Sequence, residues 1–394
     1  MTGPAASGSA SSRVVDGAEV RLSRLAVRDF RNLAAVELAV PRSGFVLLGD
    51  NAQGKTNLLE AIHYFHAFRS LRGAPDWELV RHGASVFYVA ATVEGRTTLH
   101  VSVGYDRGNG TKRISLDGVV CKRSSEALGL LPSVVVAPAD VALVAGPPAL
   151  RRRFWDVMLA ATSRSYLSAL QRYRTALAHR NAMLRGSASA AQVAAWEPLL
   201  AENGALLWLE RSRWVSWATE RLGALLAVLG ERTAVTLHHR TVPEPCRGSQ
   251  EDLAQQLAEA LRDQRQRDLA RGMTGAGPHR DDLEVRLNGL SLRRYGSAGQ
   301  QRTVAIALRL LERLWYRDLG GREPLVLLDD PFAELDSSRS EGVLESVGFA
   351  GAAQVVLAVP RAKDVPSEYR GLEVFRVSGG VVTASGGERV RQED

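Results

Sequence analysis

The sequence predicts an α/β fold in which two distant segments build one sheet-containing head around a helical insertion. Three observations predict this arrangement. Four consecutive apolar residues at 45–48 end at Gly49 and precede a helical spacing of apolar residues at 57–68. A long run rich in Ala, Leu, Arg, Glu and Gln follows at about 161–272. A second apolar strand, 324–328, comes only after that run, so we expect a sheet completed by the C-terminal part of the chain.

The N-terminal part also favours antiparallel strands. Apolar and polar residues alternate near 20–27 and again at 36–40, which is the pattern of strands with one buried face. Further segments of this kind, separated by turns rich in Gly, Asn and Asp, are 86–93, 99–105 and 113–120. We therefore expect an antiparallel β lobe beside a mixed sheet.

The C-terminal part returns to alternating helices and strands after Gly272. The expected elements are helix 299–317, strand 324–328, helix 337–347 and strand 354–359. Leucines at helical spacing in the insertion predict two or more packed helices, too short for a long coiled coil. The domain boundaries that follow are a disordered leader at 1–19, the two parts of the head at 20–160 and 273–394, and an all-helical arm at 161–272.

The positive charge of the chain is local. Fifty Lys and Arg residues against 43 Asp and Glu residues give a formal net charge of +7. The segment 151–185 contains eight arginines and one acid, so it accounts for the whole excess. Such a charge permits a polyanionic partner but does not require one.

Several classes of protein are excluded by the sequence. The two cysteines, Cys121 and Cys246, lie far apart and lack the spacing of a zinc site or a disulfide framework. The leader has no apolar core of signal-peptide length. The longest apolar stretch, 130–150, is broken by Pro132, Pro138, Asp140 and Pro147, so no membrane span is expected. These features favour a cytoplasmic protein in a reducing compartment.

A phosphate-binding loop of the form GxxxxGK[ST] lies between the expected strand 45–48 and helix 57–68. Its residues are Gly49, Asp50, Asn51, Ala52, Gln53, Gly54, Lys55 and Thr56. In such a loop, backbone N–H groups and the helix N-terminus converge on phosphate oxygens. Lys55 is expected to reach the β- and γ-phosphates of ATP, and the Thr56 hydroxyl to bind Mg²⁺. A simple turn is the alternative, which the strand and helix on either side disfavour.

A second element of such sites is an apolar strand that ends in a carboxylate, and Asp329 and Asp330 follow the strand 324–328. Asp329 is expected on the metal side, and Asp330, one residue further, is expected to polarise an attacking water as the catalytic partner of Lys55. The alternative is a solvated strand end, which the presence of a phosphate-binding loop in the same chain disfavours.

A third candidate is the start of the expected helix 299–317. Ser297, Gly299 and Gln300 stand there in the segment YGSAGQQR. A serine and a glycine at a helix N-terminus form an anion site, although the same residues are more often only a helix cap.

Together the segments GDNAQGKT, SAGQQR and LLDDPFAELD, in that order, resemble the heads of ABC-type ATPases. The segments RNLAAVELAV, NLLEAI, GPPALRRRFWD, GPHRDDL and YGSAGQQRTVAIALRL narrow the resemblance to the RecF family of bacterial recombination-repair proteins. The resemblance implies a relative of SMC heads that binds ATP between two subunits. Ser297 of one subunit would meet the γ-phosphate held by Lys55 of the other, and Asp336 would stand in the D-loop.

The resemblance also implies partners and an activity. RecF proteins are understood to bind double-stranded DNA and single-strand/double-strand junctions at gaps when ATP is bound, and to help RecO and RecR load RecA. ATP would join a homodimer, and a weak, DNA-stimulated hydrolysis would release it.

Three positions depart from the wider ABC pattern. Asp330 stands where a glutamate is usual, so we expect slow turnover. The strand 354–359 is followed by Pro360 and Arg361 without the usual switch histidine, so the sensor of the γ-phosphate is unassigned. Ala52 replaces a more common glycine, which is a conservative change if its φ is negative.

The arginine-rich segment has three possible roles. We expect duplex DNA to contact Arg151, Arg152, Arg153, Arg172, Arg174 and Arg180. Such contacts would follow the phosphate backbone with little sequence preference. A solvated helix face is the plain alternative, and residues 151–153 could instead face bound nucleotide. For the whole chain, the competing functions are a transporter ATPase and an SMC-like bridging protein.

Overall fold

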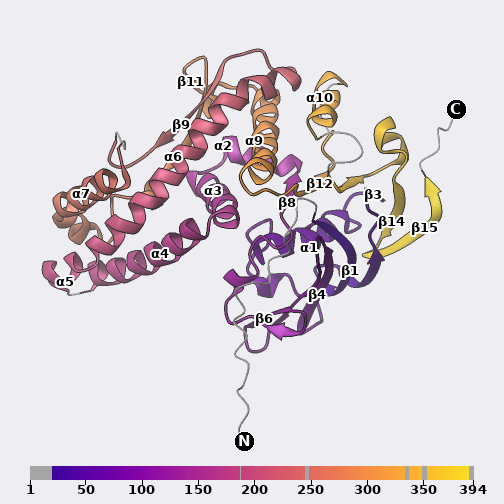
Figure 1. The fold of residues 1–394 in the computed structure, drawn as a ribbon, viewed down its shortest axis with the longest axis horizontal. Helices are drawn as coiled ribbons and strands as arrows, with labels where there is room; N and C mark the ends of the chain where they lie inside the picture. The colour runs from indigo at the N-terminus through magenta and orange to yellow at the C-terminus, as the bar shows by residue number, and fades with distance from the viewer. Residues whose placement is uncertain (1–19, 187, 245–247, 333–336, 348–352, 390–394) are drawn as a thin grey trace, which may run out of the picture. The chain divides into compact units, whose positions relative to one another are not determined.

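The protein is described by a computed structural model that covers residues 20–186, 188–244, 248–332, 337–347 and 353–389. The expected leader, 1–19, and Asp336 lie outside the described residues. The chain divides into two compact units (Figure 1). The first comprises Met1–Val135, Tyr316–Asp330 and Phe349–Asp394, and the second comprises Val136–Trp315 and Pro331–Gly348.

The first unit contains an antiparallel sheet in the order β2-β1-β4-β5-β6-β7. Its strands are β1 (Arg21–Phe30), β2 (Leu33–Ala39), β4 (Val86–Glu94), β5 (Thr98–Asp106), β6 (Thr111–Leu116) and β7 (Val119–Val120). In β4 and β5 every second side chain is buried, which confirms the antiparallel lobe predicted from the alternation of apolar residues.

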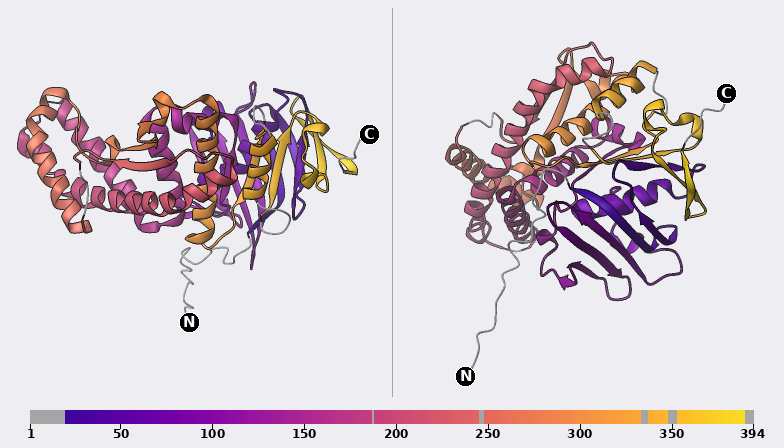
Figure 2. Two further views of the ribbon diagram at one scale, coloured as in Figure 1. Left: turned by 90° about the horizontal axis from the view of Figure 1, so that it is seen from above. Right: turned by 45° about the vertical axis from the view of Figure 1, so that its right-hand side comes forward.

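A mixed sheet in the order β15-β14-β3-β13-β12-β8 places the second half of the chain beside the first (Figure 2). Its strands are β3 (Gly44–Leu48), β8 (Ser133–Val136), β12 (Leu325–Asp329), β13 (Val355–Val359), β14 (Glu373–Ser378) and β15 (Val381–Arg389). Strands β14, β3, β13 and β12 are parallel neighbours. Strands β3 and β13 are buried throughout, as their uninterrupted apolar runs predict.

Helix α1 (Lys55–Ala67) contacts β12 and β13 of the mixed sheet. Its buried residues include Leu58, Leu59, Ile62 and Phe65, the helical spacing that the sequence showed. The shorter connections of this unit contain 3-10 turns at Asp76–Glu78, Ser124–Glu126, Ala362–Asp364 and Ser367–Tyr369.

The second unit is mainly helical. Its helices are α2 (Val141–Ala145), α3 (Pro148–Thr162), α4 (Arg164–Arg185), α5 (Ala190–Ala194), α6 (Glu197–Val228), α7 (Gln250–Arg271), α8 (Leu292–Tyr295), α9 (Ala298–Asp318, whose last residues belong to the first unit) and α10 (Ser337–Val347). Helix α6 packs against α4, α7 and α10, and its buried Trp208 and Trp214 contribute to the core.

The expected arm, 161–272, is mainly helical, as predicted, but it also contains one strand. Strand β9 (Val235–Arg240) pairs with β10 (Asp282–Leu287), which pairs with β11 (Leu290–Ser291). Leu237 is buried in β9 between exposed or half-buried neighbours, so this strand carries too short an alternation to stand out among helices. The compact helical unit is also wider than the expected 161–272, because it includes α2, α3, α8, most of α9 and α10. Two 3-10 turns, Pro138–Asp140 and Pro278–Arg280, also belong to this unit.

Candidate nucleotide site

The phosphate-binding loop links β3 to α1 in the first unit. Gly54 has φ +119°, and a Cβ there would lie 2.8 Å from Asn32 Oδ1, so only glycine fits. Ala52 has φ +64°. The condition for a conservative replacement at Ala52, a negative φ, is therefore not met, because this positive φ is a conformation that glycine adopts without cost and alanine does not.

The ammonium group of Lys55 lies over the start of the loop. Its Nζ donates hydrogen bonds to the carbonyl oxygens of Gly49 and, at 2.9 Å, of Asp50. The side chain is buried, and burial lowers the pKa of Lys55, although Asp329, Asp330 and Asp50 partly oppose this. A phosphate group that entered the loop would offer Lys55 charged oxygens in place of neutral carbonyls.

Thr56 and Asp329 bring the two predicted elements of the site together. Thr56 Oγ1 donates a 2.8 Å hydrogen bond to Asp329 Oδ2. Burial raises the pKa of Asp329, while the bond from Thr56 and the charges of Arg72 and Lys55 lower it. A hydroxyl and a carboxylate are oxygen ligands of the kind that Mg²⁺ prefers, and Mg²⁺ usually takes its other ligands from water and phosphate. The residues present therefore fit the ion.

Among the described residues, no group of three or more His, Cys, Asp and Glu side chains could hold a metal by itself.

Asp330 lies one residue beyond β12. Its backbone N–H donates a 2.8 Å hydrogen bond to the carbonyl of Ala358 in β13, and its φ of +46° turns the chain at the strand end. Aspartate tolerates this conformation better than most residues. The parallel sheet therefore holds Asp330 at the carboxyl edge of β12, where ligands of such sheets bind.

Residues that the sequence did not assign hold the loop in place. Asn32 Nδ2 donates to the Gln53 carbonyl at 3.2 Å, and Asn57 Nδ2 donates to Asn32 Oδ1 at 2.8 Å. Arg72 Nη2 in turn donates to Asn57 Oδ1 at 3.2 Å. The backbone N–H of Gly379, in the turn between β14 and β15, donates to Gln53 Oε1 at 2.6 Å. Asn32 lies in the segment RNLAAVELAV, one of the segments on which the family resemblance rests. That segment was the sequence signal that could have identified Asn32.

Ser297 belongs to the second unit and caps α9. Ser297 Oγ accepts a 3.2 Å hydrogen bond from the Gln300 N–H, and Gln300 Oε1 accepts one of 3.0 Å from the Ser297 N–H. This reciprocal pair is a capping box. Ser297 is exposed and Gly299 is half-buried, so the hydroxyl proton of Ser297 and the helix N-terminus are accessible to an anion.

Two of the six arginines expected to contact DNA are buried, so for them the expectation is wrong. Arg151 is 4% exposed and donates from Nε and Nη2 to Asp282 at 2.6 and 3.0 Å. Arg180 is 0% exposed and pairs with Asp268 at 2.8 Å and Glu197 at 3.0 Å. Both guanidinium groups form ion pairs with internal carboxylates, because a buried charge requires a partner.

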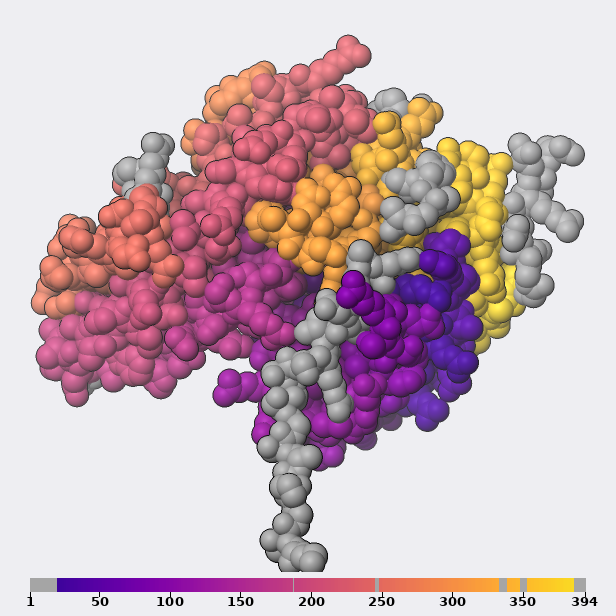
Figure 3. Space-filling model, viewed as in Figure 1, coloured from indigo at the N-terminus to yellow at the C-terminus, as the bar shows by residue number. Residues whose placement is uncertain are grey.

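The other four residues of that set are Arg152, Arg153, Arg172 and Arg174. Arg172 is exposed on α4, which lies along the lower edge of the helical unit (Figure 3). Arg174 is half-exposed and pairs with Asp156 at 2.7 Å. Arg152 is half-buried and donates to the Asp281 carbonyl at 2.8 Å. An exposed basic surface on this unit thus rests on α4 rather than on the segment 151–153.

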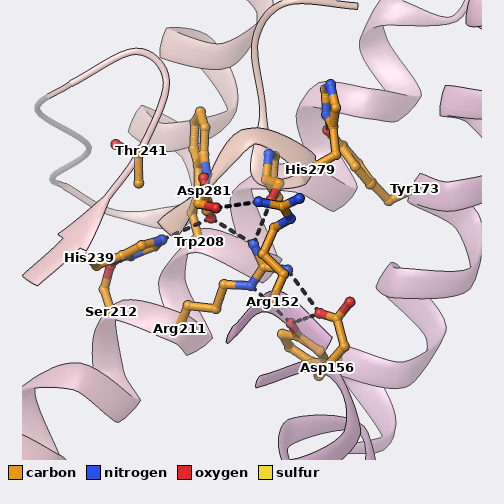
Figure 4. A network of polar contacts seen from close by, with 12 residues as sticks. Arg152, Asp156, Tyr173, Trp208, Arg211, Ser212, His239, Thr241, His279 and Asp281 are labelled. Atoms are coloured by element: carbon orange, nitrogen blue, oxygen red, sulfur yellow. Dashed lines mark hydrogen bonds and ion pairs between the residues drawn. The ribbon is translucent and has the colours of Figure 1, made fainter. Parts of the chain in front are cut away.

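The GPHRDDL segment forms a buried polar network in the second unit (Figure 4). The Asp281 carboxylate accepts hydrogen bonds from Trp208 Nε1 at 2.9 Å and Arg211 Nη1 at 2.6 Å, and lies 2.8 Å from His239 Nε2. Arg211 also pairs with Asp156 at 2.8 Å. The segment therefore ties α3, α6 and β9 together, and its role within this unit is structural.

No profile of a known protein family matches the chain. A DNA replication and repair protein RecF of Synechococcus sp. (strain JA-2-3B'a(2-13)) is 36% identical over 339 residues, which cover 83% of this chain and 88% of the relative. The chain belongs to the RecF family. The RecF of Frankia alni is 36% identical over 384 residues, covering 93% of this chain and all of that protein. The membership confirms the resemblance seen in the sequence.

Solved structures agree with the RecF assignment. The structure of the recombination mediator protein RecF with ATP has a TM-score of 0.86 at 27% identity and covers 94% of this chain and 98% of that one. An Smc head domain from Pyrococcus furiosus bound to the C-terminal domain of ScpA has a TM-score of 0.53 at 15% identity, which shows a shared fold alone. In the part of the chain that the structure describes, none of the helices combines the length and apolar character needed to cross a bilayer.

Proposed function

We propose that this protein binds ATP and Mg²⁺, dimerises on ATP, and in that state binds DNA at single-strand/double-strand gaps. There it helps RecO and RecR to load RecA, and slow ATP hydrolysis resets the dimer. The observation that carries the proposal is the contact of Thr56 with Asp329, which joins the phosphate-binding loop to the acidic strand end. Membership of the RecF family and the likeness to a RecF–ATP structure support it.

ATP is held by the loop 49–56. Lys55 leaves the carbonyls of Gly49 and Asp50 to pair with phosphate oxygens, and the α1 N-terminus adds backbone N–H donors. Thr56 and Asp329 hold Mg²⁺, which, when bound, neutralises charge on the phosphates. Asp330, fixed at the end of β12, orients the attacking water.

The dimer forms because each site is incomplete alone. The exposed Ser297 of a second copy, at the start of its α9, donates its hydroxyl proton to the γ-phosphate held by Lys55 of the first copy. The α9 N-terminus adds its positive end to the same phosphate. Asp336 of the second copy contributes from the D-loop, although it lies outside the described residues.

Hydrolysis is weak and stimulated by DNA. Asp330 is one methylene shorter than the glutamate usual in ABC-type ATPases, so its carboxylate holds the attacking water less closely. General acid–base groups contribute about 10²–10⁴-fold when well placed, and part of that gain is lost here. ATP turnover therefore times the release of the dimer.

DNA contacts arise from the exposed Arg172 and Arg174 on α4 of the second unit. These side chains neutralise backbone phosphates without reading bases, so affinity falls steeply with salt. A protein with this role works on the chromosome, in the bacterial cytoplasm.

The test is the binding of labelled single-stranded, duplex and gapped DNA, measured by fluorescence anisotropy with ATP, with ADP and without nucleotide. The proposal expects tight binding of gapped and duplex DNA only with ATP. Equal binding under all three conditions would contradict it.

A further inference from the structure

Three parallel strands end side by side at one edge of the mixed sheet. Strand β13 lies between β3 and β12. Its last residue, Val359, is level with Leu48, and Ala358 is level with Asp329. The phosphate-binding loop leaves this edge from β3, and Asp330 follows β12. Neighbouring strands are about 4.8 Å apart, so the chain that leaves β13 lies between the loop and the acidic residues.

Arg361 is the first charged residue on that chain, two positions beyond β13. Its side chain is 62% exposed and forms a bidentate pair with Asp364, with Nε–Oδ2 at 3.0 Å and Nη2–Oδ1 at 3.3 Å. Asp364 raises the pKa of Arg361, first through the hydrogen bond, and Asp330 adds a smaller contribution. The guanidinium therefore lies within electrostatic reach of the carboxylate that follows β12.

We propose that Arg361 contacts the γ-phosphate of bound ATP and so distinguishes ATP from ADP. The inference rests on the proposed function and assigns the role that the sequence left open at this strand end. A guanidinium presents N–H donors in a planar fork that fits two phosphate oxygens as well as it fits a carboxylate. Arg361 can thus exchange Asp364 for the terminal phosphate without losing its bidentate pairing.

The location of Arg361 supports this exchange. A residue buried in internal ion pairs, such as Arg180, cannot leave its partners without a large penalty. A pair as exposed as Arg361 and Asp364 contributes little to stability, so its opening costs little. Arg361 also follows the carboxyl end of β13 by two residues, and ligands of parallel sheets bind at this edge.

The test compares the dissociation constants of ATPγS and ADP, each with Mg²⁺, by isothermal titration calorimetry. Arg361→Ala is expected to weaken ATPγS binding about tenfold or more and to leave ADP binding unchanged, since a lost charged hydrogen bond has an effect of that order. Arg361→Lys should recover part of the loss. Lys363→Ala removes a neighbouring exposed positive charge and serves as the matched control.

A second variant separates phosphate contact from a structural role of the ion pair. Asp364→Ala frees Arg361 from its competitor, so ATPγS is expected to bind as tightly as before or more tightly. If Asp364→Ala weakened ATPγS as Arg361→Ala does, the ion pair itself would be required and the inference would be overturned. The inference would also be overturned if Arg361→Ala weakened the binding of ATPγS and ADP equally, so that the ratio of the two dissociation constants did not change.

Failure of the proposed function gives a different result. If the wild-type protein bound neither ATPγS nor ADP, and Lys55→Met bound neither as well, ATP binding itself would be refuted. If the unchanged protein bound ATPγS and lost it in Lys55→Met, the nucleotide site would stand, and the Arg361 variants alone would decide the inference.

Discussion

Thr56 and Asp329 are 273 positions apart in the chain, yet Thr56 Oγ1 lies 2.8 Å from Asp329 Oδ2. The contact depends on β3 and β12 ending at the same edge of the sheet, one strand apart. It joins the first and last parts of the sequence into one candidate site for Mg²⁺ and a nucleotide.

Lys55→Met is expected to abolish ATP binding and, with it, the ATP-induced dimer, because the ammonium group that anchors the phosphates is lost. Sedimentation velocity with and without ATP measures the dimer. Lys122→Met, at an exposed lysine of the same unit, is the control. A Lys55→Met protein that still dimerised with ATP would refute the role of the loop.

Ser297→Arg is expected to keep ATP binding but to prevent dimerisation, because a bulky cation replaces the hydroxyl at the α9 N-terminus. Loss of the cap alone costs about 1 kcal/mol. Ser249→Arg removes the equivalent capping box of α7 and controls for that cost. The cross-subunit role of Ser297 would be untenable if both variants reduced the dimer equally.

The double change Arg172→Glu and Arg174→Glu is expected to weaken duplex binding and to flatten the slope of log affinity against log salt by up to about 2. The matched control, Arg262→Glu with Arg267→Glu, places the same charge change on exposed positions of α7. Equal effects of the two pairs would mean that net charge, rather than this face of α4, governs binding.

Arg180→Met is expected to destabilise the helical unit by about 3–5 kcal/mol, because it leaves the buried carboxylates of Glu197 and Asp268 without this partner. Urea unfolding followed by circular dichroism measures the loss. Arg172→Met, at an exposed position, should change stability by less than about 0.5 kcal/mol. A DNA-contacting Arg180 would show the opposite pattern, with lost DNA affinity and unchanged stability.

Stability of the helical unit should also depend on pH through His279. Burial lowers the pKa of His279 to about 4, whereas an unfolded histidine titrates near 6.5. Between these values the unfolded chain binds the extra proton, so the free energy of unfolding is highest above pH 6.5 and falls as the pH drops toward 4. The loss is at most about 3 kcal/mol, because part of the side chain is exposed.

His279→Gln is expected to remove this pH dependence in urea unfolding between pH 4 and 7. His238→Gln, at an exposed position of β9, should not. If the free energy of unfolding of His279→Gln still fell between pH 7 and 4, the pH dependence would belong to another group.

Much of the fold was predictable because its elements have local signals. The uninterrupted apolar run of β3, the loop glycines and the helical spacing in α1 each follow from residues close together in sequence. Strand β9 was missed, because a short alternation such as 235–240 is stabilised by pairing with β10, which no local pattern reveals.

The site was partly predictable for the same reason. Lys55 and Thr56 follow from a contiguous motif, and Asp329 follows from a strand end. The support from Asn32, and the burial of Arg151 and Arg180, depend on partners that are distant in sequence. A count of charges cannot distinguish an arginine paired inside the protein from one on its surface.

The most direct measurement is analytical ultracentrifugation of the protein alone, with ATP, and with ATP and gapped DNA. We expect a monomer alone, a dimer with ATP, and a larger complex that contains two copies of the chain when gapped DNA is added. A sedimentation coefficient that did not change with ATP, or a DNA complex that formed equally without it, would contradict ATP-dependent dimerisation on DNA.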